Sequence, residues 1–307
     1  MRAFAIAAAG AGPELIEKPD PTPGPGEVLV RVAASSVNGF DAMVAAGMLQ
    51  GMMEHRFPVV LGKDFAGTVE AVAEGASRFA VGQAVFGVVM KPYLGDGGLG
   101  ELLVVGEQYG IASVPDGLDL HVAGALGLAG TAAVDALDAV ALQPGDNVLI
   151  SGATGGAGSI AVQYAAASKA TVIATARPGR AADFVRDLGA AHTVDYTADV
   201  TAQVNEIAPK GVDAVLHLAG DGAALAGLLA EGGRLASTLG FGPDQHPAAV
   251  SIMADPTPAI LERLAADVVA GRIRVPITNS HPLTNAAQAF ADYGQRALGK
   301  LAISVRT

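Results

Sequence analysis

The first 114 residues alternate short apolar runs with turns, a pattern typical of β-strands. Gly, Pro and Asp separate the runs, and one short helix fits residues 40–47. The strands are expected at residues 4–8, 27–32, 69–72, 84–89 and 101–105. This part of the chain is therefore predicted to form a β-rich, barrel-like domain.

The pattern changes near residue 118. Residues 121–142 are rich in Ala and Leu at helical spacing, and buried strands then alternate with helices. The strands are expected at 147–150, 171–175, 192–194, 213–217 and 233–238, and the helices at 160–168, 181–188, 201–207 and 223–229. Such alternation indicates βαβ units and a parallel sheet buried on both faces.

After this alternating region, the last part of the sequence again resembles the first domain in its pattern of short elements. Helices are expected at 260–269 and 286–290, and strands at 272–275 and 301–305. Because 307 residues exceed the usual size of one hydrophobic core, we expect two domains. Residues 1–117 and 252–307 are predicted to form the first, and residues 118–251 are predicted to be inserted as the second.

One glycine-rich turn stands between a predicted strand and a predicted helix. The strand ends near Ser151, and the turn contains Gly155, Gly156, Ala157 and Gly158. Glycines allow close approach of the backbone to a pyrophosphate, and the helix N-terminus favours its negative charge. The turn departs from the usual fingerprint at Ala153, where the first glycine would stand. We predict that it holds a dinucleotide.

Composition narrows the function classes. The net charge of −11 leaves no basic surface for nucleic acid. With no Cys, the chain has neither a thiolate nucleophile nor cysteine-ligated zinc. No apolar run reaches the roughly 18 residues of a spanning helix, so we expect a cytoplasmic protein without membrane or nucleic-acid partners.

The residue after the second parallel strand indicates which dinucleotide binds. An acidic residue there would hold the ribose 2′-hydroxyl of NAD. This chain has Arg177, which would grip a 2′-phosphate with charge-assisted hydrogen bonds, and Thr175 precedes it with a hydroxyl. We therefore predict NADPH as the cofactor.

The sequence resembles the medium-chain dehydrogenase/reductases, in their zinc-free quinone oxidoreductase (zeta-crystallin-like) branch. The resemblance rests on these segments, quoted as they stand: Pro25-Gly26-Glu27-Val28, Ser36-Val37-Asn38, Leu61-Gly62-Lys63-Asp64-Phe65-Ala66-Gly67, Leu188-Gly189-Ala190 and Gly299-Lys300. It implies an α/β fold, with a GroES-like β-barrel domain, an inserted Rossmann domain with a doubly wound parallel sheet, and an active-site cleft between them. It also suggests a homodimer joined near residues 235–241.

The resemblance assigns candidate roles. Asn38 is expected to hold a carbonyl or the nicotinamide ribose, Thr131 matches a position near the nicotinamide, and Tyr93 is a candidate proton donor. Lys300 matches the lysine near the cleft. Each has a structural alternative, such as a turn amide for Asn38 or helix back-bonding for Thr131. Ala219, Gly220 and Phe241 complete the expected cofactor-binding set.

The family's zinc dehydrogenases place Cys, His and Cys where this chain has Asn38, Lys63 and Gly127. We therefore expect no metal site and no metal-activated alkoxide chemistry. The family's Arg and aromatic residue that follow Asp41 are replaced by Ala45 and Leu49. This predicts an apolar pocket and leaves quinone as the acceptor open.

The predicted function is a zinc-independent, NADPH-dependent reductase that passes hydride to a quinone or an α,β-unsaturated carbonyl. The expected partner is a small apolar or aromatic carbonyl compound. Two alternatives remain at this point: a polyketide-type enoyl reductase, and a non-catalytic NADPH-binding redox sensor.

Overall fold

The computed structural model describes residues 1–306, which divide into two compact units. Unit 1 comprises residues 1–129, 256–271 and 277–307, and unit 2 comprises residues 130–255 and 272–276. The helix α3 (Gly127–Val140) carries the chain from the first unit into the second. As domains, residues 1–117 with 252–307 and the insert 118–251 stay a prediction.

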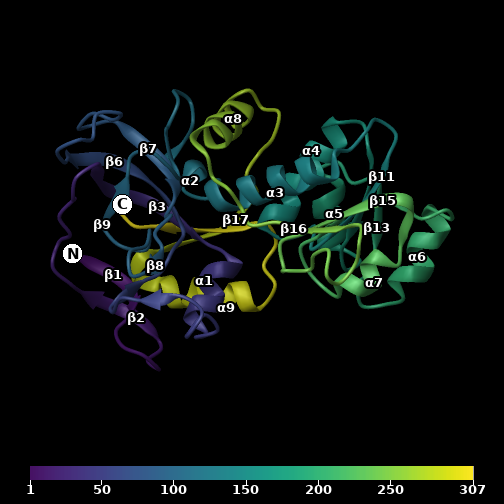
Figure 1. The fold of residues 1–307 in the computed structure, drawn as a ribbon, viewed down its shortest axis with the longest axis horizontal. Coiled ribbons are helices and arrows are strands. Elements are labelled where there is room, and N and C mark those ends of the chain that lie inside the picture. Colours follow the sequence, from purple (N-terminus) through teal and green to yellow (C-terminus); the bar gives the residue numbers. More distant parts are fainter. Residues whose placement is uncertain (307) are drawn as a thin grey trace. The chain divides into compact units, whose positions relative to one another are not determined.

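Unit 1 is built around a seven-stranded sheet. Its order is β10 (Ile111–Ser113), β7 (Ala84–Val88), β6 (Asp64–Val72), β3 (Glu27–Val37), β18 (Lys300–Ser304) and β17 (Ile277–Pro282), and β9 (Leu102–Gly106) also pairs with β3. Figure 1 shows β3, β6 and β7 side by side, as their antiparallel registers require.

The long strand β3 shows why this sheet forms. Val28, Val30 and Val32 alternate with outward residues and are fully buried, which is the period of two that a half-buried strand requires. Their side chains join Phe65 and Ile303 in the core of the unit. The strand predicted at residues 27–32 is therefore confirmed.

Smaller elements complete unit 1. A three-stranded sheet has the order β2 (Pro13–Glu17), β1 (Arg2–Ile6) and β5 (Val59–Val60), and β4 (Glu54–His55) pairs with β8 (Tyr93–Leu94). The helical elements are α1 (Gly39–Ala45), α2 (Leu120–Ala123), α8 (Pro258–Val269), the 3₁₀ turn η1 (Leu283–Asn285) and α9 (Ala286–Gly294).

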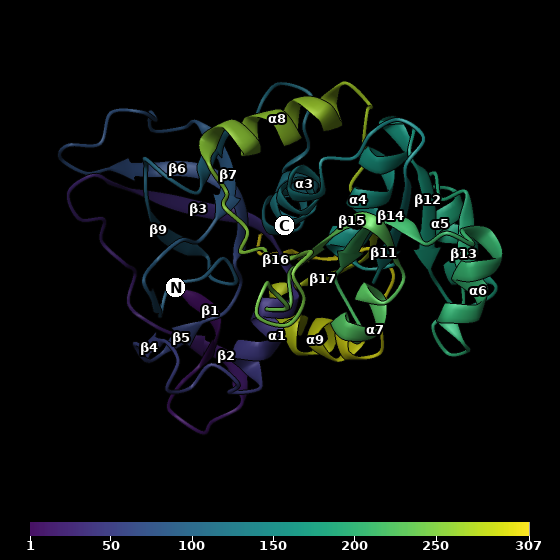
Figure 2. The same cartoon turned by 45° about the vertical axis from the view of Figure 1, so that its right-hand side comes forward.

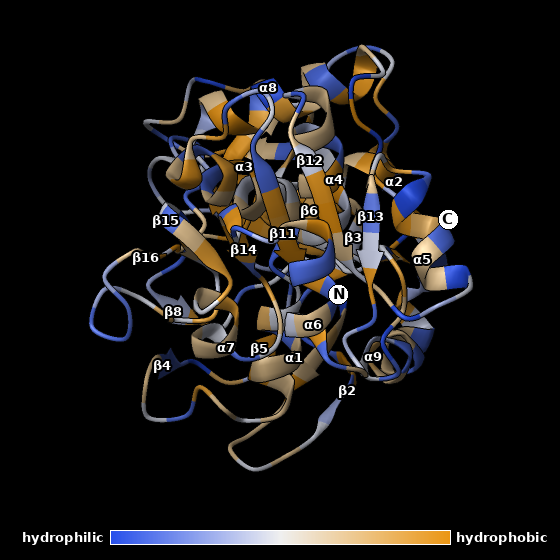
Figure 3. Ribbon diagram, turned by 90° about the vertical axis from the view of Figure 1, so that its right-hand side faces the viewer, coloured by the Kyte–Doolittle hydropathy of each residue, from blue (hydrophilic) through white to orange (hydrophobic). Residues whose placement is uncertain are grey.

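Unit 2 is a six-stranded parallel sheet. Its order is β13 (His192–Val194), β12 (Thr171–Thr175), β11 (Asn147–Ser151), β14 (Val212–His217), β15 (Leu229–Ser237) and β16 (Ala249–Ser251). This is the doubly wound order of a Rossmann sheet, in which the direction of winding reverses between β11 and β14. Val148, Leu149 and Ile150 are all fully buried, and β11 and β12 are coloured as hydrophobic in Figure 3.

Four helices connect the strands of this sheet. α4 (Gly156–Ala167) packs on β11 and β12, and α5 (Arg180–Arg186) packs on β13, as Figure 2 shows. α6 (Val200–Ile207) also packs on β13, and α7 (Gly222–Ala226) packs on β14 and β15. The predicted βαβ alternation and the α/β fold class are confirmed. No helix within residues 1–306 is long and apolar enough to span a membrane.

Two sequence predictions are wrong. Residues 272–275 form no strand, because the side-chain amide of Gln163 bonds both the N–H and the C=O of Arg274, at 2.8 and 2.9 Å, in place of a neighbouring strand. The helix expected at 121–142 is interrupted after Gly124, where an added Cβ would stand 2.8 Å from the backbone of Ala34. This close approach to β3 separates α2 from α3.

Candidate active site and cofactor site

The glycine-rich turn lies where the winding of the unit 2 sheet reverses. It follows β11 and leads into α4, whose N-cap is Gly155. Ser159 makes the first hydrogen bond of the helix, to the carbonyl of Gly155 at 2.9 Å. The N–H groups of Gly156, Ala157 and Gly158 come before Ser159 in the chain and belong to the first turn of α4. The N–H groups of a first turn have no acceptor within the helix, so they suit an anion.

Two of these glycines are required by close packing or conformation. A Cβ on Gly158 would stand 2.2 Å from the carbonyl oxygen of Gly152, so the helix packs directly on the turn. Gly152 itself has a φ of 75°, in the left-handed region that glycine accepts without strain. Gly155, by contrast, has no neighbour closer than 3.4 Å to a Cβ, which leaves space beside the turn. The residues present thus fit a dinucleotide pyrophosphate.

The end of β14 meets the same turn. Ser151 donates a hydrogen bond from its hydroxyl to the carbonyl of Ala219, and a Cβ on Gly152 would lie 3.1 Å from the Ala219 side chain. Ala219 and Gly220 are exposed, and Gly220 has a φ of 88°. Ala219 and Gly220 therefore lie beside the glycine-rich turn. Their contact with a cofactor stays a prediction.

The hydroxyl of Thr175 holds the turn from beneath. It accepts a hydrogen bond from the N–H of Gly152 at 3.0 Å and lies 3.4 Å from the carbonyl of Ile150. The residue is 5% exposed, so its hydroxyl supports the backbone of the turn. Direct contact of Thr175 with a cofactor stays a prediction.

Arg177 is exposed just beyond β12, with its guanidinium 5.5 Å from the ring centroid of Tyr196. The nearby carboxylate of Asp195 accepts hydrogen bonds from the N–H and the hydroxyl of Thr197, at 2.9 and 2.7 Å. These bonds, with a smaller contribution from Arg177, lower the pKa of Asp195. Arg177 is thus held by an aromatic face rather than neutralised by a hydrogen-bonded carboxylate.

A second network surrounds Phe241. The His217 ring lies edge-on to Phe241 at 6.0 Å, and its two nitrogens lie 3.0 Å from the Ser237 hydroxyl and 3.1 Å from the Gly220 carbonyl. These contacts tie the ends of β14 and β15 together. His217 is therefore held in a satisfied structural network, and Phe241 packs beside it.

Unit 1 contains a buried polar cluster, which we define as Ser36, Asn38, Asp41, Asp64 and Lys300. Asp64 is fully buried, and Lys300 is 2% exposed. Nζ of Lys300 donates to Oδ1 of Asn38 at 2.5 Å and to Oδ2 of Asp64 at 3.3 Å. Nδ2 of Asn38 donates to Oδ2 of Asp64 at 2.8 Å, and the Ser36 hydroxyl donates to the same oxygen at 2.5 Å.

The carboxylate of Asp41 links two backbone segments of this region. Its Oδ2 accepts the N–H of Asn38, and its Oδ1 accepts the N–H of Lys63, each at 2.9 Å. Burial, reinforced by the negative charge of Asp64, raises the pKa of Asp41 to about 6. Asn38 and Lys63 are therefore fixed to one another through a single buried carboxyl group.

Two other predicted residues make separate contacts. The hydroxyl of Tyr93 donates to Asp96 at 3.0 Å, and the guanidinium of Arg56 lies 3.6 Å from the centre of its ring. Burial and the charge of Asp96 raise the pKa of this phenol. Thr131 is fully buried in α3. Catalytic roles for Tyr93 and Thr131 stay predictions.

The segment after Asp41 divides between core and surface. Ala45, Leu49 and Met53 pack partly buried against the core of unit 1. Met48 and Met52 are 64% and 76% exposed.

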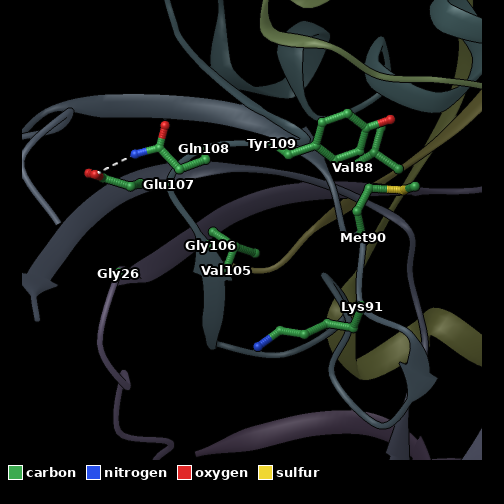
Figure 4. Close-up of a pocket in the computed structure, with 9 residues that line it drawn as sticks. All are labelled: Gly26, Val88, Met90, Lys91, Val105, Gly106, Glu107, Gln108 and Tyr109. Carbon is green, nitrogen blue, oxygen red and sulfur yellow. Dashed lines mark hydrogen bonds between the residues drawn. The ribbon is translucent and has the colours of Figure 1, made fainter. Parts of the chain in front are cut away.

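Unit 1 also has a pocket that is separate from the polar cluster (Figure 4). It is lined by Val88, Met90, Val105 and Lys91 among others, and none of its lining residues belongs to the cluster.

Within residues 1–306, His, Asp and Glu do not gather in groups of three that could ligate a metal ion. Lys63 carries an ammonium in place of a ligand, and a Cβ on Gly127 would lie 2.9 Å from the carbonyl of Gly87, which leaves no room for a side chain.

The sequence did not lead us to predict that Asp64 belongs to the site or that it pairs with Lys300. A carboxylate inside the apolar run Asp64-Phe65-Ala66 was the available signal, because a buried acid needs a partner.

A Rossmann sheet with a glycine turn at its reversal point, joined to a barrel-like unit, defines a nicotinamide dinucleotide-binding oxidoreductase. The profile of the alcohol dehydrogenase GroES-like domain matches residues 24–116, and that of the zinc-binding dehydrogenase family matches residues 156–264. The chain belongs to the medium-chain dehydrogenase/reductase superfamily, in its quinone oxidoreductase branch.

Individual relatives agree with this placement. The chain is 31% identical to a chloroplast envelope quinone oxidoreductase homologue of Arabidopsis thaliana, over 95% of this chain and 94% of the relative. It is 38% identical to a 2-haloacrylate reductase of Burkholderia, over 63% of this chain and 58% of the relative. It is 34% identical to a mycocerosic acid synthase-like polyketide synthase of Mycobacterium tuberculosis, over 92% of this chain but only 14% of that protein.

Solved structures share the fold. The quinone oxidoreductase of Coxiella burnetii superimposes with a TM-score of 0.90 at 26% identity, over 100% of this chain and 99% of the other. A mycobacterial protein solved with NADPH gives a TM-score of 0.84 at 26% identity, with 99% of each chain covered.

Proposed function

We propose that this protein is a zinc-independent, NADPH-dependent reductase that transfers hydride to a quinone or an α,β-unsaturated carbonyl. The observation that carries the proposal is the pairing of two sites in one chain. Unit 2 has a glycine turn with Arg177 nearby, and unit 1 has a buried polar cluster at Asn38. The similarity to quinone oxidoreductases and to a 2-haloacrylate reductase supports the acceptor class.

The preference for NADPH rests on Arg177. The end of β12 offers this arginine and no acidic residue from Val172 to Pro178. A guanidinium stacked on Tyr196 is pre-organised to hold a 2′-phosphate, whereas a carboxylate at this place would repel it. The structure of a mycobacterial relative with NADPH supports the same choice.

NADPH, when bound, supplies the hydride. The chain's own contribution on the acceptor side is Asn38, whose amide orientation is fixed by Lys300 on Oδ1 and Asp64 on Nδ2. In this proposal, the second hydrogen of Nδ2 bonds the acceptor oxygen as negative charge develops there. Solvent then supplies the proton that completes the reduction.

The residues at the three positions where the family's zinc dehydrogenases bind zinc support a mechanism without zinc. The amide of Asn38, the ammonium of Lys63 and the hydrogen of Gly127 do not form a zinc-binding set. Elemental analysis of purified protein tests this: stoichiometric zinc would contradict it.

One observation favours a second candidate, a polyketide-type enoyl reductase. The match to part of a mycobacterial polyketide synthase spans nearly the whole of this chain. Such an enzyme would reduce enoyl groups carried on pantetheine far better than free quinones. The net charge of −11 disfavours docking to an acidic carrier.

The deciding experiment is NADPH oxidation measured with a panel of quinones, enals, enones and an enoyl-pantetheine thioester. Turnover of quinones or enones by NADPH supports the proposal. Preference for the thioester supports the second candidate. Binding of NADPH without turnover of any acceptor would indicate a redox sensor instead.

We also propose a cytoplasmic homodimer joined at the edge of the unit 2 sheet. Strand β16 pairs only with β15 among residues 1–306, and Val250, Met253 and Leu239 near that edge are 40%, 89% and 55% exposed. An uncovered edge strand with apolar neighbours favours pairing with another chain. Light scattering of the eluted protein tests it, and a monomeric mass would contradict it.

A further inference from the structure

Lys63 differs from the other buried lysines of unit 1 in its partners. Its side chain is partly buried, and Nζ donates to the carbonyl of Val89. Lys300 is ion-paired with Asp64, and Lys91 is ion-paired with Glu27 at 2.6 Å. Within residues 1–306, the ammonium of Lys63 has no ion pair.

The position of Lys63 relative to Asn38 is set by two contacts. Both backbone N–H groups are bound to the carboxylate of Asp41, and Nζ of Lys63 lies 5.1 Å from the centre of the Phe40 ring. Phe40 stands in the first turn of α1, two residues after Asn38. Nζ of Lys63 therefore lies near a side chain in the first turn of α1, the helix that follows Asn38.

We propose that the ammonium of Lys63 binds the acceptor oxygen and stabilises the negative charge that forms on it, as a catalytic residue beside Asn38. This inference rests on the proposed reductase function. The hydride adds to the β-carbon of the acceptor and reduces it, the π electrons of the C=C bond move to the carbonyl oxygen, and the reduced nicotinamide is oxidised. The resulting enolate oxygen is the anion that Lys63 holds until solvent delivers a proton to the α-carbon.

The charged groups around Lys63 are compatible with this role. Asp41 and Asp64 face the region and favour the charged lysine, but both carboxylates are already bound by backbone or side-chain donors. Burial outweighs them and lowers the pKa of Lys63. A partly desolvated ammonium without a carboxylate partner interacts more strongly with an anionic oxygen than one in bulk water.

The test compares Lys63→Met with Lys91→Met, a variant of a lysine that lines the pocket of Figure 4 and is ion-paired with Glu27. For Lys63→Met we expect kcat/KM to fall about 10²-fold with enones and much less with easily reduced quinones, because a strong acceptor needs less help with its charge. Lys63→Arg should recover part of the loss. Lys91→Met should not lower kcat/KM selectively for either enones or quinones.

A second readout needs no turnover. The complex with NADP⁺ is titrated with 4-nitrophenol, whose phenolate imitates the enolate oxygen and absorbs differently from the phenol. Wild type should bind the phenolate form about ten-fold more tightly than Lys63→Met does, which is the difference expected for one charge-assisted hydrogen bond. Lys63→Gln replaces Lys63→Met if the latter unfolds.

The outcomes separate the two proposals. Equal losses for all acceptors, together with phenolate binding that is independent of residue 63, would overturn the role of Lys63 and leave the reductase function standing. Lys63-dependent phenolate binding without turnover of any acceptor by wild type would overturn the reductase function and leave the anion site standing.

Discussion

Lys300 donates a hydrogen bond of 2.5 Å to the side-chain oxygen of Asn38, although 262 residues separate them in the sequence. This bond decides which way the amide points. Because Oδ1 faces the lysine, Nδ2 faces Asp64 and donates to its carboxylate. A buried cation thus sets the donor geometry of the site.

Replacement of Asn38 by Ala should lower kcat/KM by about 10²-fold, since one donor to the developing anion is lost. NADPH affinity, measured from the fluorescence of the bound cofactor, should stay within about two-fold of wild type. An equal fall in cofactor affinity and kcat/KM would place Asn38 in cofactor binding instead.

Lys300→Met should destabilise the fold by about 3–5 kcal/mol, because it leaves Asp64 charged and buried without its cation. The free energy of unfolding in urea measures this. The double variant Lys300→Met with Asp64→Asn should regain part of the stability. A double variant less stable than Lys300→Met would show that the other bonds of Asp64 matter more than its charge.

Arg177→Ser should weaken NADPH binding at least ten-fold, which corresponds to about 1.4 kcal/mol, and leave NADH binding nearly unchanged. Arg180→Ser, at an exposed arginine at the start of α5, serves as the matched control. Parallel losses for both cofactors would contradict recognition of the 2′-phosphate by Arg177.

Asp41 should make stability depend on pH. Its pKa is about 6 in the folded protein against an ordinary value of 3.8, so the native state holds the proton more tightly. The contribution is full below pH ~4 and is lost as pH rises through ~6, which amounts to about 3 kcal/mol. Urea unfolding from pH 4 to 7 should show this fall for wild type relative to Asp41→Asn. Identical slopes in the two proteins would refute it.

Gly158→Ala should disrupt unit 2 and abolish NADPH binding, because the new Cβ would stand 2.2 Å from the Gly152 carbonyl. Gly12→Ala is the control, since nothing lies within 4 Å of a Cβ there. Thermal unfolding followed by circular dichroism measures both. A Gly158→Ala protein that melts like wild type and binds NADPH normally would contradict the packing argument.

The parts of the site that could be predicted from the sequence are local in the chain. The turn from Gly155 to Gly158 and the arginine after β12 both follow from short-range patterns of strand, turn and helix. The pairing of Lys300 with Asp64 could not be predicted in this way, because 236 residues separate the partners and no local pattern links them. Their contact depends on the registers of both β18 and β6 against β3, which lies between them.

The secondary structure could likewise be predicted where it follows from local patterns, and not where it depends on residues distant in the sequence. The apolar runs at β3 and β11 correctly indicated strands, and the alternation of strands with helices correctly indicated that β11 lies in a parallel sheet. The segment 272–275 misled the prediction because its apolar alternation is local, whereas the Gln163 side chain that occupies its backbone comes from a distant helix.

The pairing of β18 with β3 has a consequence for how the protein is made. Ala302 lies opposite Ser36, so β3 is synthesised long before its partner strand β18. Until the ribosome has released that partner, Asp64 lacks its cation and Asn38 lacks the bond that orients it. Unit 2 contains its whole sheet between residues 147 and 251 and can mature first on the nascent chain. The capacity to hold a cofactor would then precede the capacity to use it.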